Sequence, residues 1–462
     1  MTLLLACLGS CVTPGFKMPE QSTLPLEGLY RGYGADDSTC MARMSWHEYY
    51  ADPRLQALIG EALDSNLNLR INIKRMEEAR AYWRKSRMGF VPTLAASAQA
   101  QFASPSDNGT SAVGPNVSKP IQDYSLGVSA SWEIDIWGKI RSAKREAYAN
   151  LLSQEATKNA VVTQLVADMA GSYYRLLMLD EQLRITEKTI DNYTEYLETV
   201  KALKMSAQAN EVAVQQAYAQ LYGAQSYIPE LMASIEATET YIGFLLGKPG
   251  FKVERADSLD ISMIGCDLSV GLPAQLLQYR PDVMAAEQSL RASHYRFNVA
   301  KASMYPSLTI GGSVGVESVK IKEWFDPESL FWNAVGGLVA PIINARALRT
   351  QKEVAKLQNE ESLLAFKAAI LNAGMEVSNA VAQCRSTARQ VEIQSKQTEA
   401  LAKSYEYSQM LLVRGYATYI DVLVAQTGLF NSQIALNTTS YNAIAQRIEL
   451  YRALGGGWTT EK

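Results

Sequence analysis

Four segments of the chain alternate apolar and polar residues, which is the pattern of a β-strand with two unlike faces. The clearest segment is YSLGVSASWEIDIW, residues 124–137, and beyond Gly138 a charged, alanine-rich helical pattern begins. Similar alternation occupies residues 94–102 and 308–316 and, less regularly, residues 330–343. The pattern therefore predicts four strands, the second of which runs directly into a helix.

Long stretches without proline carry a seven-residue apolar repeat, which is typical of coiled-coil packing. In the stretch from Ser142 to Val200, an apolar residue recurs every seventh position: Met169, Leu176, Leu183, Ile190 and Leu197. A second stretch of similar length runs from Arg346 to Leu412. About 60 helical residues span about 90 Å, so each stretch predicts a long rod.

Each long helix is expected to turn and return. In LLVRGYATYIDVL, residues 411–423, Gly415 suits a left-handed helix stop, and Thr418 with Asp421 predicts a capping box for the next helix. The first half ends at LLGKPG, residues 245–250, where glycine and proline terminate a helix.

The helix and hairpin pattern occurs twice. The segments beginning at Arg70 and Met284 align without a gap, and Pro92 and Pro306 are 214 residues apart (306 − 92). This period is too long for a solenoid and indicates a duplicated half. We expect a first repeat at 46–250 with a hairpin at about 91–136, a linker at 251–271, a second repeat at 272–456 with a hairpin at about 306–343, and a tail at 457–462.

Composition adds mainly exclusions. The net charge of −3 gives no field that favours nucleic acid, and we expect no nucleic-acid partner. Two histidines and five scattered cysteines favour neither a metal site nor a disulfide framework. We therefore predict no catalytic residue, no metal and no cofactor beyond a covalent lipid.

The apolar start MTLLLACLGSC resembles the end of a lipoprotein signal, with residues 1–10 as its remnant. On this interpretation Cys11 carries the lipid, residues 11–45 form a lipid-anchored linker, and Val12, where inner-membrane lipoproteins have Asp, points to the outer membrane. The alternative is a ragged apolar N-terminus with two thiols.

No apolar run is long enough for a membrane-spanning helix, but strands of 10 to 13 residues have the length of a tilted β-strand crossing a bilayer. Four strands cannot close a barrel, whereas three chains would supply twelve. Trp132 and Ile134 would then face lipid, and Glu133 and Asp135 would line the water-filled lumen. A β-sandwich strand with a core face and a wet face has the same alternation, so that alternative stays open.

Ordered motifs over nearly the whole chain resemble the outer-membrane efflux lipoproteins of the TolC-like superfamily, in the type that serves RND-type tripartite pumps. They are CVTPGFKMPE, ADPRLQALIGEAL, ASWEIDIWGKIRSA, LPAQLLQYRPDVMAAEQSL, AKASMYPSLTIGGSVG, VAPIINAR, RGYATYIDVLVAQ and LYRALGGGW. The resemblance implies a mainly α fold with a β-barrel part: a homotrimer whose twelve-stranded outer-membrane barrel, four strands per chain, continues into a long periplasmic α-helical barrel.

The implied function is a passive exit duct in the outer membrane of a Gram-negative bacterium, fed by an inner-membrane RND-type transporter through a periplasmic adaptor and gated at the periplasmic helix tips. The resemblance places lipid on Cys11, adaptor docking and the moving tip at Arg414, Gly415 and Tyr416, and a gate acid at Asp421.

The chain departs from the family at several of these positions. A latch arginine of some relatives corresponds to Ala417 and a second gate acid to Val424, and Arg346 replaces a usual glycine. The first tip, in KMSAQANEVAVQQA, has Ala207 near the place of a glycine, and we expect a similar turn there. The latch mechanism of relatives therefore does not transfer directly.

Two other functions compete with the duct. GGSVG, residues 311–315, fits the nucleophile elbow of hydrolases around Ser313, but alternation continues through the motif and only His47 and His294 could supply a base. A periplasmic coiled-coil adaptor or scaffold lipoprotein would explain the rods but not the two hairpins. The cargo, whether drug, solvent, metal ion or peptide, is not encoded in any motif.

Overall fold

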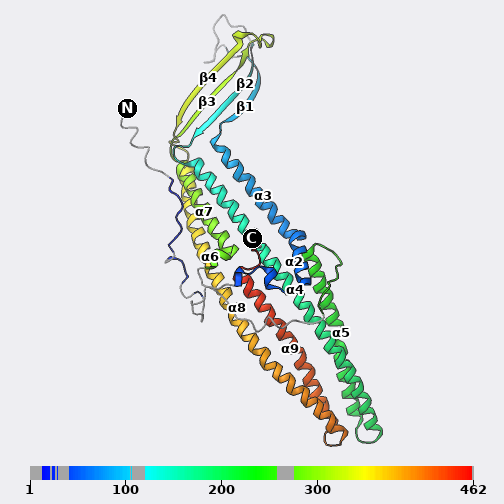
Figure 1. Ribbon diagram of the computed structural model, residues 1–462. Helices are drawn as coiled ribbons and strands as arrows, with labels where there is room; N and C mark the ends of the chain where they lie inside the picture. Colours follow the sequence, from blue (N-terminus) through cyan, green and yellow to red (C-terminus); the bar gives the residue numbers. More distant parts are fainter. Residues whose placement is uncertain are drawn as a thin grey trace. The chain divides into compact units, whose positions relative to one another are not determined.

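A computed structural model describes residues 13–20, 23–26, 29, 41–104, 106, 120–256 and 275–459 (Figure 1). Cys11 and the predicted signal remnant at 1–10 lie outside the described residues. The helices of four or more residues are α1 Trp46–Tyr49, α2 Pro53–Ser65, α3 Leu67–Arg87, α4 Lys139–Met205, α5 Glu211–Leu246, α6 Leu276–Tyr279, α7 Pro281–Ala302, α8 Ala347–Val413 and α9 Tyr419–Ala453. The strands are β1 Thr93–Ala103, β2 Ile121–Ile134, β3 Ser307–Ser318 and β4 Leu330–Val339.

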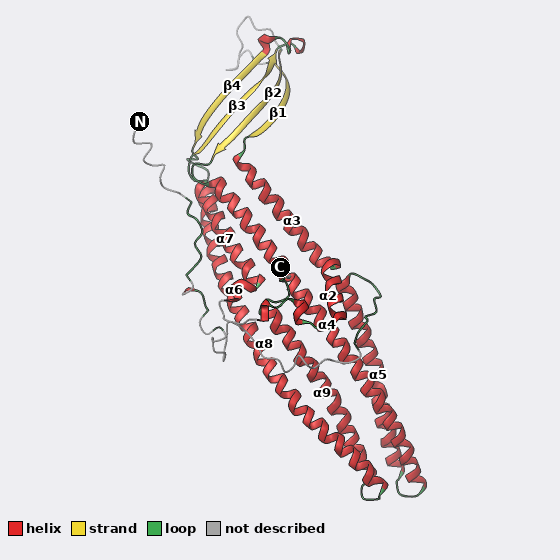
Figure 2. Cartoon of the chain, in the orientation of Figure 1, coloured by secondary structure: helices red, strands yellow, loops and turns green. Residues whose placement is uncertain are grey.

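The four strands form one antiparallel sheet in the order β1-β2-β3-β4 (Figure 2). Each hairpin comes from one repeat, and β2 pairs with β3, so the two repeats join edge to edge. At this seam Gly127 is opposite Gly315. A Cβ at Gly315 would lie 2.4 Å from the carbonyl oxygen of Leu126, so only glycine allows this approach.

The four predicted strands and both predicted long helices form where the alternation and the heptads place them. Helices α4 and α8 have 67 residues each, which corresponds to about 100 Å of continuous helix. Among the described residues, no helix has the length and apolar character needed to cross a membrane.

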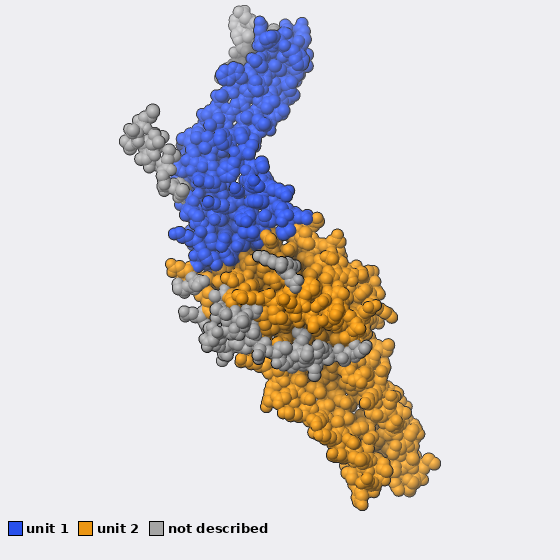
Figure 3. Space-filling view, viewed as in Figure 1, with its two compact units in different colours: residues 1–19, 76–153, 286–365 blue, residues 20–75, 154–285, 366–462 orange. Residues whose placement is uncertain are grey.

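The chain divides into two compact units that cut across the repeats (Figure 3). One unit comprises the described parts of residues 1–19, 76–153 and 286–365, and it contains the sheet. The other comprises the described parts of 20–75, 154–285 and 366–462. Each unit is therefore built from corresponding parts of both repeats, as a duplication predicts.

The largest apolar core lies in the second unit. It joins α1 and α2 to the middle of α4 and to the C-terminal parts of α5 and α9. Its fully buried side chains include Tyr50, Leu55, Ile59, Met169, Tyr173, Leu176, Ile242 and Ile444. The heptad residues Met169 and Leu176 are completely buried, which confirms that the seven-residue repeat marks a packed helix face.

Candidate functional site

The sheet has one apolar and one polar face, as the alternation predicts. Val128 is opposite Ala96 and Val314, and Val314 is opposite Trp332, so this row is apolar across all four strands. The next row, Ser129, Ala95, Ser313 and Asn333, is small and polar. Leu94 and Trp332 on the apolar face are 74% and 76% exposed. An exposed apolar face beside a polar one suits a strand between hydrocarbon and water.

Glu133 and Asp135 both contact the start of α4. Glu133, opposite Thr309 in the sheet, accepts a hydrogen bond from Lys139 Nζ at 2.9 Å. Asp135 accepts from the backbone N–H of Ile140 at 2.9 Å and of Arg141 at 3.0 Å. Its carboxylate is only 8% exposed and also pairs with Arg141 Nε at 3.0 Å. Asp135 thus satisfies free amides at a helix N-terminus, and a lumen-lining role for either residue stays a prediction.

The two helical hairpins of the second unit, α4–α5 and α8–α9, end in turns of the same geometry (Figure 1). Ala207 has φ 59° and Gly415 has φ 77°, and they are 208 residues apart (415 − 207). The carbonyl of Leu203 accepts from Gln208 and Ala209, and that of Leu411 accepts from Tyr416 and Ala417. The similar turn expected at Ala207 is therefore present, with alanine in a conformation that favours glycine.

The predicted capping box at the second tip is present. Asp421 Oδ2 accepts from the backbone N–H and the hydroxyl of Thr418, both at 2.7 Å, and Thr418 Oγ1 accepts from the Asp421 N–H at 3.4 Å. These hydrogen bonds from Thr418 lower the pKa of Asp421 below its usual value. Within this chain the proposed gate acid serves its own helix, and its gating role stays a prediction.

Tyrosine hydrogen bonds and an apolar cluster join the two hairpins near their tips. Tyr196 on α4 donates to the backbone carbonyl of Tyr419, the first residue of α9, at 2.7 Å. Nearby, the hydroxyls of Tyr193 and Thr427 are 3.3 Å apart. The cluster around them contains Leu197, Val200, Ala213, Val214, Val422 and Leu423. Burial raises the pKa of Tyr196 well above its ordinary value, so its hydroxyl keeps the proton that it donates.

A further pair of sites, which sequence reasoning missed, closes each repeat. In the first repeat, buried Asn66 precedes α3 and donates through Nδ2 to the carbonyl of Leu245 near the end of α5 at 2.9 Å. In the second, buried Arg280 precedes α7 and donates through NH1 to the carbonyl of Ala453, the last residue of α9, at 2.8 Å. Asn66 and Arg280 have the same 214-residue spacing as Pro92 and Pro306, and this was the available signal.

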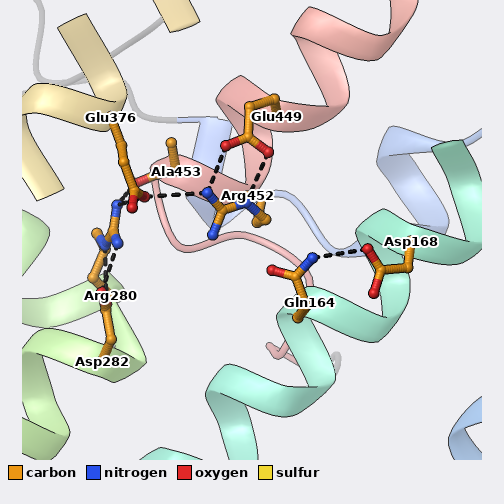
Figure 4. A network of polar contacts seen from close by, with 8 residues as sticks. All are labelled: Gln164, Asp168, Arg280, Asp282, Glu376, Glu449, Arg452 and Ala453. Atoms are coloured by element: carbon orange, nitrogen blue, oxygen red, sulfur yellow. Dashed lines mark hydrogen bonds and ion pairs between the residues drawn. The ribbon is translucent and has the colours of Figure 1, made fainter. Parts of the chain in front are cut away.

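The second junction also carries a network of charges (Figure 4). Arg280 pairs with Asp282 at 2.6 Å and with Glu376 at 2.9 Å, and Glu376 also contacts Arg452 at 3.2 Å. Burial disfavours the charged guanidinium, but the carboxylates of Asp282 and Glu376 outweigh it, so the pKa of Arg280 is raised. Burial likewise opposes the charge of Asp282, yet the Arg280 partner holds the pKa of Asp282 below its usual value.

The remaining residues singled out by the sequence have structural positions. Ser313 lies within β3, where its backbone N–H donates to Asn333 Oδ1, rather than at a strand-to-helix elbow. His294 contacts the carbonyl of Pro14 at 3.3 Å, and His47 stacks on Trp46. Among the described residues, no group of three or more His, Cys, Asp or Glu side chains is placed to hold a metal ion.

Comparisons with known proteins agree with this architecture. The model of the family described as "Outer membrane efflux protein" matches residues 58–248 and 272–456, which are nearly the two repeats. Cation efflux system protein CusC of Escherichia coli O6:H1 is 28% identical over 446 residues, covering 96% of this chain and 94% of its own. The solvent efflux pump outer membrane protein SrpC of Pseudomonas putida is 29% identical, covering 99% and 98%.

Solved structures match equally well. A crystal structure of CusC superposes with a TM-score of 0.84 at 26% identity, covering 96% of this chain and 99% of that chain. The open state of the MtrE outer membrane channel of Neisseria gonorrhoeae gives 0.86 at 24% identity, covering 96% and 98%. The predicted fold class is confirmed: four strands per chain for a twelve-stranded trimeric barrel, continued by a helical barrel.

Proposed function

Because this chain belongs to the outer membrane efflux protein family and is an outer-membrane efflux channel, we propose that it works with a periplasmic adaptor and an RND-type inner-membrane transporter and opens by separating its two helical tips. The supporting observation is the two-faced sheet followed by two long helical hairpins with matching exposed turns. Such a chain can offer one surface to lipid, one to water and one to a partner.

The tip turns supply the surface for the adaptor. At the second tip Tyr416 is 82% exposed, and Arg414 and Gly415 are also exposed. At the first tip Met205 is 90% exposed. Adaptor helices that contact these turns can apply force directly to the ends of both hairpins, where few interactions must break for the hairpins to part.

The contacts that resist opening lie between α4 and α9. The Tyr196 hydroxyl holds the first residue of α9, and the cluster beneath it buries apolar side chains of both hairpins. One neutral hydrogen bond contributes about 0.5–1.5 kcal/mol, so its loss favours the open state by a factor of roughly 2 to 13. Tyr196→Phe deletes this bond and keeps the ring that packs in the cluster.

Single-channel recording in a planar bilayer tests the duct and its gate together. The wild type should insert and give discrete conductance steps, and Tyr196→Phe should raise the open fraction. Tyr222→Phe is a matched control, because Tyr222 on α5 is 60% exposed. Steps that do not respond to Tyr196→Phe would exclude this contact from the gate, and the absence of any steps would refute the channel.

Asp421→Ala separates the gate acid from the helix cap. If Asp421 repels or binds charge at the entrance, its removal should change the open fraction or the ion selectivity. If it only caps α9, Asp421→Asn should behave like Asp421→Ala in stability and leave conductance unchanged.

The lipid on Cys11 and the cargo complete the proposal. Thr13, two residues after Cys11, donates to the carbonyl of Trp137 at the base of β2 at 3.3 Å, which is a suitable position for a membrane anchor. The relatives are named for cations, solvent and pyoverdine. We expect the transporter rather than the duct to select the cargo, because a wide passive tube discriminates weakly.

A further inference from the structure

A cavity in the first unit gathers cationic and aromatic side chains from three helices. It has a volume of about 510 Å³ and lies between α3, α4 and α7. Its lining residues are Trp83, Lys144, Arg145, Tyr148, Ala149, Leu152, Gln288, Arg291 and Tyr295. Three of these nine residues are cationic, three are aromatic, and none is acidic. Neither the fold nor the gating mechanism requires this composition.

The cations are held in place by aromatic rings and are not fully neutralised by acids. The Arg145 guanidinium lies 5.8 Å from the Tyr295 ring centre, and Lys144 Nζ lies 5.9 Å from that of Phe90. The rings of Trp83 and Tyr148 lie against each other at 5.5 Å. A cation over an aromatic face keeps its full charge for a further partner.

Arg291 adds a donor that lacks an acceptor. One of its terminal nitrogens pairs with Glu287 at 2.5 Å, but its Nε is buried and has no hydrogen-bond partner among the described residues. A buried unpaired donor is costly unless a bound group supplies an acceptor. An anion in the cavity would satisfy it.

The position of the cavity along its helices indicates the source of the anion. Lys144 and Arg145 are five and six residues from the start of α4, or about 8–9 Å, and helical side chains tilt toward the N-terminus. Strand β2 ends just before α4, and the headgroup layer below a bilayer core is about 5–8 Å thick. Long basic side chains at this depth can extend back into the headgroups.

The N-terminal segment gives a second estimate of the same depth. Thr13 is bonded to the Trp137 carbonyl, so Cys11 lies within about 7 Å of it along the chain. Gly138, at φ 77°, makes room for this segment, because a Cβ there would lie 2.2 Å from Thr13 Oγ1. Phe16 then packs under Arg291 at 5.4 Å. The lipid-bearing segment therefore reaches the residues that line the cavity.

We infer that this cavity, with Lys144, Arg145 and Arg291 around its aromatic floor, is a binding site for the phosphate headgroup of an anionic phospholipid in the periplasmic leaflet of the outer membrane. The inference rests on the proposed function, because it requires the strands to cross the membrane. The phosphate oxygens accept from Arg291 and the α4 cations, and the acyl chains extend along the apolar face of the sheet. Clustered basic residues beside a membrane segment recognise anionic lipid in this way.

The test uses the full-length protein purified in detergent, with phosphatidylglycerol and phosphatidylcholine of identical acyl chains as probes. Native mass spectrometry counts bound lipid, and a titration gives the affinity. The wild type should prefer phosphatidylglycerol, and Lys144→Gln with Arg145→Gln should weaken its binding about thirtyfold. Arg84→Gln with Lys85→Gln is the matched control. It removes two exposed charges of α3 at the same depth, outside the cavity, and should change the affinity by less than threefold.

A rescue variant separates charge from folding. Lys144→Arg with Arg145→Lys keeps both charges and should restore the preference. Equal loss in both glutamine variants would overturn the site in favour of a diffuse basic belt. Equal binding of phosphatidylcholine would also overturn it, as would displacement of the lipid by millimolar inorganic phosphate, which indicates a free-anion site. Wild-type conductance steps without a phosphatidylglycerol preference would refute this inference alone, whereas absence of steps would refute the channel.

Discussion

The two junctions that close the repeats have the same backbone arrangement and different chemistry. Asn66 and Arg280 stand directly before α3 and α7, and each donates to a carbonyl at the end of the returning helix, Leu245 or Ala453. After those carbonyls, Gly247 and Gly455 both adopt positive φ, at 68° and 90°. The first junction is a neutral amide, whereas the second is a buried guanidinium with carboxylate partners.

This difference teaches what a duplicated fold must keep. A helix C-terminus needs a donor for its free carbonyls, and either an amide or a guanidinium can supply one. The geometry is therefore retained while the residue type is free to change. The charged junction gains strength from its network but depends on every partner being present, because a buried charge without a counter-charge is costly.

Removal of Arg280 should have the largest effect. Arg280→Ala leaves Asp282, Glu376 and the Ala453 carbonyl without their shared donor, and should lower the free energy of unfolding by about 3–5 kcal/mol. Chemical denaturation of the purified protein in detergent measures it. Arg296→Ala is the control, because the exposed Arg296–Glu146 pair should contribute less than about 1 kcal/mol. Equal effects at the two arginines would show that the network adds no stability.

The neutral junction should be weaker. Asn66→Ala removes the hydrogen bond to Leu245 and the cap on the Leu69 N–H, and should cost about 1–3 kcal/mol in the same measurement. A loss as large as that of Arg280→Ala would mean that the shared geometry, and not the charge, sets the strength of both junctions.

Acid should distinguish the junctions by sign. The pKa of Asp282 is held below its usual 3.8, so its ion pair stabilises the fold above about pH 4, and this contribution is lost as the pH falls through the lower folded value. The first junction has no titrating member. Asp282→Asn should therefore flatten the stability profile below pH 4, measured as the thermal unfolding midpoint against pH, whereas Asn66→Ala should shift it without changing its slope there.

The two tips extend the comparison with the smallest expected effect. Gly415→Ala places a Cβ at φ 77° and should destabilise the turn by about 1 kcal/mol. Ala207→Gly relieves the same strain at φ 59° and should stabilise by up to about 1 kcal/mol, reduced by the added backbone freedom of glycine. Thermal unfolding of both variants checks the opposite signs. The same sign in both would indicate that partner contacts, not backbone strain, dominate the tips.

Much of the fold could be predicted because its signals are local. The strands, the long helices and the capping box of Thr418 and Asp421 each depend on residues within a few positions of one another. Asp135 shows the limit of such reasoning. Alternation places it beside Glu133 on a polar strand face, but the chain leaves the sheet at Ile134, and its carboxylate turns to the amides that begin α4.

The sequence alone determined the two-faced strands, the heptad helices, the turn at Gly415 and the duplication, because the period of side chains along a strand or helix sets which face each residue occupies. Only the tertiary structure decided which distant groups meet. Tyr196 reaches the Tyr419 carbonyl, Arg280 reaches that of Ala453, and Lys144, Arg145 and Arg291 surround one cavity. The physical reason is that a donor or a charge has the same character in sequence wherever it lies, and only packing removes water from it and selects its partner.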